Sequence, residues 1–306
     1  MRKRIWVLVA RCCLIFIFVF ALASTTGQIM LGQGEGSALA GKTASTTQLQ
    51  SMQGLKGEIH PGADPTKGIL LDDEFDGNSL GASTWNTCHW WQDQGCTISS
   101  NNELEWYLPQ QVSVSNGALH LTADRSAVVA SDGKDYSFAS GMVTTGPPAH
   151  NMPPKLAFTN GKVDVRFQLP SGRGLWPAIW LLPASENSLP EIDMLEAVGD
   201  DTGRLSMHLH PKNRSVPPLG KDYLLPKGQS LTDGWHTVSL DWSPGLLTYF
   251  LDGKQVWQVI GNQVPDEPMY LVMNLAVGGE FPGNPDKSTK FPAILSIDHV
   301  LIQRNN

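Results

Sequence analysis

Polar and apolar residues alternate in short runs along most of the chain. In the runs 162–167 and 205–210, apolar side chains occupy every second position, which is the period of a strand with one buried face. Turn sequences such as Ser243-Pro244-Gly245 and Asp252-Gly253 separate neighbouring runs and are typical of hairpins. From about Gly68 onward, the pattern therefore predicts strands and turns.

The spacing of the predicted strands indicates the fold class. Further strands are predicted over residues 118–122, 270–277 and 294–302. Many short strands at regular spacing are typical of a sandwich or a barrel. A domain of roughly 240 residues with this pattern is most simply a large sandwich. We predict an all-β fold, a two-sheet β-jelly-roll sandwich.

The N-terminal region differs from the rest of the chain. Residues 1–23 combine a basic start, an apolar run and Ala21-Leu22-Ala23, which fits a signal peptide cleaved before Ser24. An uncleaved anchor is the alternative, although Arg11 interrupts the apolar stretch. Residues 24–66 are rich in Ser, Thr, Gly and Gln and indicate a flexible linker. The domain is then 67–306. We expect a secreted or periplasmic protein, with N-terminal anchoring as the alternative.

Composition and charge argue against some classes of binding partner. Charged residues make up 17% of the chain, and the net charge is −7. Basic residues gather only in the first four positions, so nucleic acid is not an expected partner. We expect a monomer without stable membrane association once the signal is removed.

Cysteines give one prediction. Cys12 and Cys13 would leave with the signal, and Cys88 and Cys96 would remain. In an exported chain, this pair favours one disulfide that closes a small loop, with two free buried thiols as the alternative.

Three carboxylates stand in an apolar setting, in the segment Glu191-Ile192-Asp193-Met194-Leu195-Glu196. On a strand, Glu191 and Asp193 share a face, whereas Glu196 lies at an odd offset and would point the other way. A β-bulge at Met194-Leu195 would return Glu196 to the shared face. Either the carboxylates converge as in an acid/base glycosidase, or they line an ordinary solvent face.

Several ordered blocks decide between these two interpretations. The catalytic segment resembles the bulged Glu-x-Asp-x-x-Glu signature of glycoside hydrolase family 16, in its laminarinase-like (endo-1,3-β-glucanase) branch. The resemblance spans about residues 70–302. The other matching blocks are 73–77, 102–107, 161–183, 233–236, 274–279 and 296–300.

The resemblance implies roles for the three carboxylates. Glu191 would be the nucleophile, Glu196 the general acid/base and Asp193 the assisting carboxylate. The implied reaction is retaining hydrolysis of an internal β-glucan bond on a concave substrate cleft, without a required cofactor. The implied partner is a polysaccharide.

Other side chains are candidates for substrate binding, each with a structural alternative. Trp176 and Trp180 can share a strand face, where they would stack on sugar rings or belong to the core. His210 is favoured over His208 as a hydrogen-bond donor to substrate or to Glu196. The remaining candidates are Trp90, Trp91, Asn102, Glu105 and Arg173.

A structural calcium ion is a further expectation. The resemblance places Glu74 and Asp298 on two strands that calcium bridges in many family members, and carboxylate oxygens suit this ion. Three alternatives stay open for the function: a transglycosylase, a hydrolase of another polysaccharide such as a galactan or exopolysaccharide, and a non-catalytic carbohydrate-binding protein.

Overall fold

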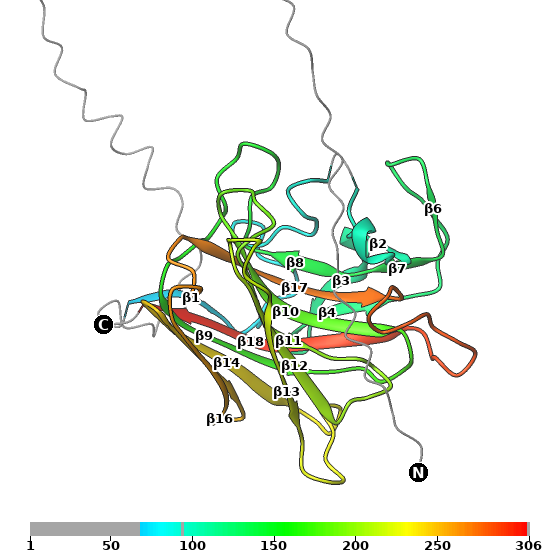
Figure 1. The fold of residues 1–306 in the computed structure, drawn as a ribbon. Coiled ribbons are helices and arrows are strands. Elements are labelled where there is room, and N and C mark those ends of the chain that lie inside the picture. The colour runs from blue at the N-terminus through cyan, green and yellow to red at the C-terminus, as the bar shows by residue number, and fades with distance from the viewer. Residues whose placement is uncertain (1–67, 93–94, 305–306) are drawn as a thin grey trace, which may run out of the picture. The chain divides into compact units, whose positions relative to one another are not determined.

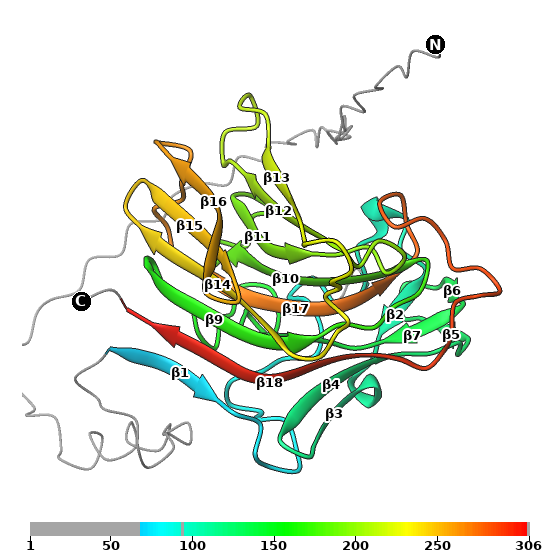
Figure 2. The same ribbon diagram turned by 90° about the horizontal axis from the view of Figure 1, so that it is seen from below.

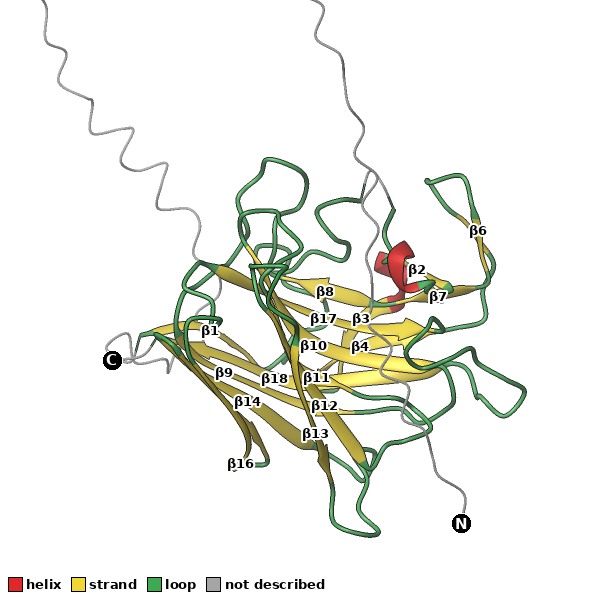
Figure 3. Ribbon diagram, viewed as in Figure 1, coloured by secondary structure: helices red, strands yellow, loops and turns green. Residues whose placement is uncertain are grey.

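Two antiparallel β-sheets form the two layers of the domain (Figure 1). The computed structural model describes residues 68–92 and 95–304. The predicted signal peptide (1–23) and linker (24–66) lie outside the described residues. The predicted sandwich of short strands is confirmed, and Figure 3 shows that helix is confined to short turns near β2.

The larger sheet has eight strands, and seven of them follow one hydrogen-bonded path. The additional strand, β1, pairs with β18 along its edge, as Figure 2 shows. In spatial order the strands are β16 (Lys254–Ile260), β15 (Leu246–Leu251), β14 (His236–Ser243), β9 (Gly161–Gln168), β18 (Ala293–Gln303), β4 (Ala118–Ala123) and β3 (Val112–Ser115), with β1 at Ile69–Asp73.

The smaller sheet has six strands and carries the segment with the three carboxylates. Its strand order mixes distant parts of the sequence, because β17 lies between β8 and β10. In spatial order the strands are β13 (Leu219–Leu224), β12 (Arg204–His210), β11 (Glu191–Glu196), β10 (Leu175–Pro183), β17 (Met269–Val277) and β8 (Met142–Thr144).

Short elements complete the described chain. Two small sheets form from pairs of short strands, one parallel and one antiparallel. They are β2 (Glu105–Tyr107) with β7 (Phe138–Ser140), and β5 (Val128–Val129) with β6 (Asp135–Tyr136); the 3₁₀ helices are η2 (Ser99–Asn101) and η3 (Pro109–Gln111). No helix in the described part of the chain has the length and apolarity needed to span a bilayer.

The main core lies between the two sheets. Strand β9 shows how alternating side chains build this core. Val163, Val165 and Phe167 are fully buried. Lys162 and Arg166, on the other face, are not. This alternation matches the prediction for residues 162–167. Strands β10 and β17 are buried along their whole length, so both faces of the smaller sheet are covered at its centre.

A second apolar cluster covers the outer face of the smaller sheet at β10, β17 and β8. It includes Trp106, Tyr107, Trp180 and Tyr270, together with Cys96. Because this cluster occupies one end of the outer face, the exposed part of that face lies toward β11 and β12. The three carboxylates are on β11.

Candidate active site

Strand β11 contains the predicted β-bulge. Asp193 pairs with His208 and Glu196 pairs with Ser206 on β12, so three steps on β11 match two on its partner. On the other side, Leu195 pairs with Ile179 and Asp193 with Trp180 of β10, which leaves Met194 as the extra residue. The predicted bulge at Met194-Leu195 is therefore confirmed.

The bulge sets which side chains of β11 face the core. Ile192, Met194 and Leu195 are all completely buried in the main core. Glu191 and Glu196 are half-buried, and Asp193 is 4% exposed. Two consecutive residues thus point inward, which leaves Glu196 on the side of Glu191 and Asp193.

Glu196 is held by two donors from neighbouring strands. The indole Nε1 of Trp176 on β10 donates to Oε1 at 3.1 Å. The imidazole Nδ1 of His208 on β12 lies 2.5 Å from Oε2. Both carboxylate oxygens of Glu196 are therefore occupied, which fixes the direction of the group.

The histidine nearest Glu196 differs from the prediction. His210 was expected to donate to substrate or to Glu196, and its Nε2 lies 3.2 Å from Oδ2 of Asp193 and 3.6 Å from Oε1 of Glu191. The physical reason is register, because His210 pairs with Glu191 while His208 pairs with Asp193, one step closer to Glu196. The two imidazoles link all three carboxylates.

Charge around His208 changes its proton affinity. Burial lowers the pKa of the imidazole, but the hydrogen bond to Glu196 and the charges of Glu196 and Asp193 raise it by more. The net result is a pKa above the ordinary value. A protonated His208 beside Glu196 is thus favoured further into the neutral range than in a free histidine.

Trp180 belongs to a buried hydrogen-bonded chain. Its side chain is 7% exposed, and its Nε1 donates to Oδ1 of Asn274 at 2.7 Å. The amide of Asn274 in turn donates to the hydroxyl of Tyr107 at 3.0 Å. The core alternative for Trp180 fits this burial, because its side chain belongs to the second apolar cluster.

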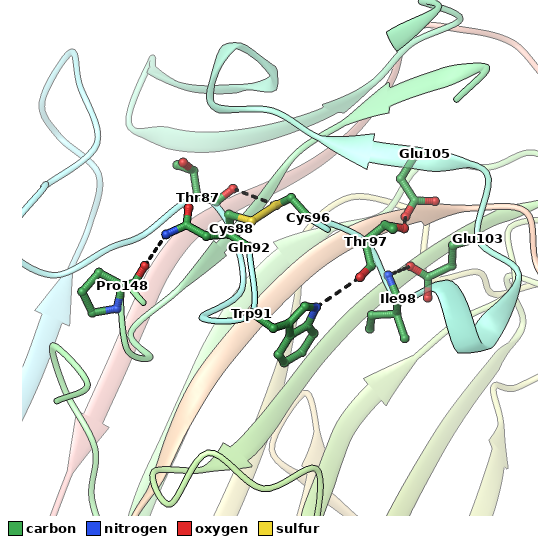
Figure 4. Close-up of a disulfide and its surroundings, with 10 residues drawn as sticks. All are labelled: Thr87, Cys88, Trp91, Gln92, Cys96, Thr97, Ile98, Glu103, Glu105 and Pro148. Atoms are coloured by element: carbon green, nitrogen blue, oxygen red, sulfur yellow. Dashed lines mark hydrogen bonds between the residues drawn. A yellow bond between two sulfur atoms is a disulfide. The ribbon is translucent and has the colours of Figure 1, made fainter. Parts of the chain in front are cut away.

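The loop after Cys88 brings aromatic rings to this end of the sheet. The structure joins Cys88 to Cys96, as predicted, with a Cα–Cα distance of 5.5 Å (Figure 4). Trp91 donates to the carbonyl oxygen of Thr97 and stacks on His89 with 4.0 Å between ring centroids. Trp90 and Trp91 are both half-buried.

Glu105 cannot contact a polysaccharide. Its side chain is completely buried, where Oε2 accepts from the backbone N–H of Val277 at 2.7 Å and Oε1 accepts from Thr97 at 3.3 Å. Glu103 is also buried close by. Burial, and then the charge of Glu103, raise the pKa of Glu105 well above the ordinary range. The sequence analysis missed this because Glu105 begins β2, a strand of three residues that is too short to show a period in the sequence.

The remaining candidates are exposed and lie on loops. Asn102 donates to Glu280 at 3.0 Å and borders a surface hollow of about 300 Å³ that the three carboxylates do not line. Arg173 donates to the carbonyl oxygen of Asn284 at 3.2 Å. Both side chains are held by the loop that follows β17.

One aromatic residue escaped the sequence analysis. Phe281 is 37% exposed, and its ring lies 5.3 Å from that of Trp176, which itself binds Glu196. An exposed aromatic ring beside a carboxylate-binding tryptophan is a surface on which a sugar can stack. The signal was its position two residues beyond Gly279, where the matching block ends.

The predicted calcium ligands lie at the β1–β18 edge. Asp298 forms an ion pair with Arg166 through Oδ2, while its buried Oδ1 has no hydrogen-bond partner among the described residues. Ligand atoms of Asp72, Glu74 and His299 lie within 4.8 Å of one another. A buried carboxylate oxygen without a donor and further carboxylates nearby fit a hard cation.

Comparison with known proteins identifies a family. The profile of "Glycosyl hydrolases family 16" matches residues 99–294. A glucan endo-1,3-beta-glucosidase A1 from Niallia circulans is 32% identical over 266 residues, which cover 77% of this chain and 38% of that protein. Endo-1,3-1,4-beta-glycanase ExsH from Rhizobium meliloti is 29% identical and covers 75% of this chain and 50% of that protein. The chain thus spans half the length, or less, of these relatives.

Solved structures give the same result for the fold. The catalytic domain of an endo-1,3-beta-glucanase (laminarinase) from Thermotoga petrophila has a TM-score of 0.69 and 29% identity, and covers 78% of this chain and 98% of that one. An endo-beta-1,3-glucanase from Pyrococcus furiosus has a TM-score of 0.70 and 28% identity, with coverage of 77% and 94%.

Proposed function

Since the chain belongs to glycosyl hydrolases family 16, we propose that it is a retaining endo-β-glycosidase that hydrolyses internal 1,3 linkages of a β-glucan such as laminarin. The observation that carries the proposal is the bulge at Met194, which keeps Glu191, Asp193 and Glu196 on one face of β11. The linkage is favoured because similar proteins are named as 1,3-glucanases.

The first step forms a covalent glycosyl-enzyme. A carboxylate oxygen of Glu191 attacks the anomeric carbon, and the bond from that carbon to the leaving oxygen breaks. Glu196 gives its proton to that oxygen, so the departing sugar leaves as a neutral alcohol. The donors Trp176 and His208 then stabilise the carboxylate that forms on Glu196.

The second step reverses these roles. Glu196 takes a proton from water, whose oxygen attacks the anomeric carbon and releases Glu191 as a carboxylate. Two inversions at the same carbon retain its configuration. Asp193 is the assisting carboxylate, and the contact of His210 with both Asp193 and Glu191 orients the pair.

Aromatic and polar side chains around this centre bind the polysaccharide in our proposal. Phe281, which is 37% exposed, provides one stacking surface beside Trp176 and Glu196, whereas Trp176 is 6% exposed and acts through its hydrogen bond to Glu196. Trp90 and Trp91 provide a second one on the disulfide loop. Asn102 and Arg173 contribute exposed hydrogen-bond donors.

We also infer an exported protein with a structural cation. The Cys88–Cys96 disulfide supports an oxidising compartment, secreted or periplasmic.

A calcium ion held by Asp298 and Glu74 would link β18 to β1 and would take no part in the chemistry. We expect the enzyme to act as a monomer.

The proposal is tested by the products released from laminarin. We expect internal cleavage, seen as a range of oligosaccharides, and NMR should detect the β-anomer first. Glu191→Gln and Glu196→Gln should each reduce hydrolysis by at least about 10³-fold while far-UV circular dichroism stays unchanged. Lichenan, agarose and keratan sulfate are the comparison substrates. Full activity in either variant, or hydrolysis of a galactan alone, would contradict the proposal.

A further inference from the structure

Two imidazoles and one carboxylate converge beside the proposed nucleophile, and we propose that they form a binding site for Zn²⁺. The ligand atoms of Asp193, His208 and His210 all lie within 4.8 Å of one another. The site lies on two adjacent strands, β11 and β12, so both sides are fixed by the sheet. Hydrolysis requires no such ion, and binding would be a separate property of the same surface.

Strand geometry places the three ligands. His208 and His210 are two positions apart on β12, so both imidazoles leave the same face. Asp193 pairs directly with His208 across the sheet. Its Oδ2 lies 3.2 Å from Nε2 of His210 and 3.9 Å from Nδ1 of His208. Two ligand atoms around a tetrahedral zinc ion are roughly 3.3 Å apart, so small side-chain rotations complete the site.

The donor set selects the type of ion. Two imidazole nitrogens and one carboxylate oxygen are the ligands that zinc takes in open, three-ligand sites. Calcium and magnesium prefer oxygen ligands alone and would not select this pair of histidines. The imidazole side chains are 28% and 26% exposed, so an ion can reach the site from solvent.

Zinc in this position would compete with the hydrolytic machinery. Nδ1 of His208 lies 2.5 Å from Oε2 of Glu196, so the same nitrogen cannot serve zinc and this hydrogen bond together. Asp193 would be held by the ion instead of assisting Glu191. Zinc should therefore inhibit the enzyme reversibly. This inhibitory effect rests on the proposed function, whereas binding itself does not.

Calorimetric titration of ZnCl₂ into the metal-free full chain tests the binding. We expect His210→Gln to weaken this site at least tenfold. The matched control is His299→Gln, which removes a histidine from the separate cluster at the β1–β18 edge and should leave the affinity of this site unchanged. Equal affinity in wild type and His210→Gln would overturn the proposal.

Two measurements on the wild type do not depend on how a variant folds. Anomalous diffraction at the zinc edge should place the ion between Asp193, His208 and His210, and an ion found only elsewhere would overturn the proposal. Zinc should also inhibit laminarin hydrolysis, with recovery when a zinc-selective chelator is added. A protein that binds zinc here but cleaves no glucan would refute the proposed function and leave the zinc site standing.

Discussion

Nδ1 of His208 lies 2.5 Å from Oε2 of Glu196, across the strand pair β11–β12. Neither residue is the register partner of the other, since His208 pairs with Asp193 and Glu196 pairs with Ser206. The contact exists because the bulge at Met194 returns Glu196 to the face that His208 occupies. The bulge in β11 therefore decides which group contacts the proposed acid/base.

The pH dependence of stability should report this contact. The folded pKa of His208 is raised above 6.5, so the stabilising contribution of its protonated imidazole is complete below pH 6.5 and is lost as the pH rises through the folded value. The free energy of unfolding should therefore fall over this window in the wild type and change less in His208→Gln. Urea denaturation at pH 6 and pH 8.5 measures the difference. His120→Gln, in β4 of the other sheet, is the control. If the free energy of unfolding changed with pH by the same amount in the wild type and in His208→Gln, the result would argue against the contact.

Trp176 should contribute to catalysis through one hydrogen bond. Trp176→Phe keeps an aromatic ring but removes the Nε1 donor that lies 3.1 Å from Oε1 of Glu196. A hydrogen bond to a charged group contributes about 1.5–3 kcal/mol, so kcat/KM on laminarin should fall roughly 10- to 100-fold.

The same substitution in the core gives the control for Trp176. Trp242 lies on β14 of the larger sheet, and its buried Nε1 donates to the carbonyl oxygen of Pro265 at 3.0 Å. Trp242→Phe removes this donor. We expect this variant to be less stable while kcat/KM of the folded enzyme is unchanged. If both variants lost activity equally, the loss would reflect general packing and not the bond to Glu196.

The buried pair Glu103 and Glu105 should make the fold less stable as the pH rises. The folded pKa of Glu105 is raised well above its ordinary value, so the folded state holds a proton that the unfolded state releases. Stability should fall as the pH rises from the unfolded pKa through the folded one. Glu105→Gln carries no such proton and should unfold at a higher temperature than the wild type at pH 8. Glu280→Gln, which changes an exposed carboxylate, should match the wild type.

The regular parts of this fold follow from the sequence. Alternation in residues 162–167 predicted the two faces of β9, and the odd offset of Glu196 predicted the bulge, because a strand period of two leaves few choices. The irregular parts did not follow. Glu105 was a candidate for substrate binding, yet its buried carboxylate is held by Val277, which lies 172 positions away. Trp180 likewise depends on Asn274, 94 positions away on β17.

The choice between His208 and His210 shows the same limit of prediction from the sequence. His208 and His210 share a strand face, so spacing alone does not separate them, and the preference for His210 in the sequence analysis had no basis in strand geometry. Register between β11 and β12 separates them, and register depends on the whole sheet. A prediction from spacing could name the pair but not the partner of each.

Deleting Met194 should retain the active arrangement at a cost in stability. Without the extra residue, β11 alternates regularly, with Ile192 and Leu195 inward and all three carboxylates outward. The variant loses a completely buried methionine, which costs about 2–5 kcal/mol. We expect measurable laminarin hydrolysis with a lowered melting temperature. Deleting Ile192 is the matched control, since it shortens the same strand but turns Glu191 away from Asp193 and should abolish hydrolysis. Loss of activity in the folded Met194 deletion would mean that the bulge sets the spacing of the carboxylates as well as the face they share.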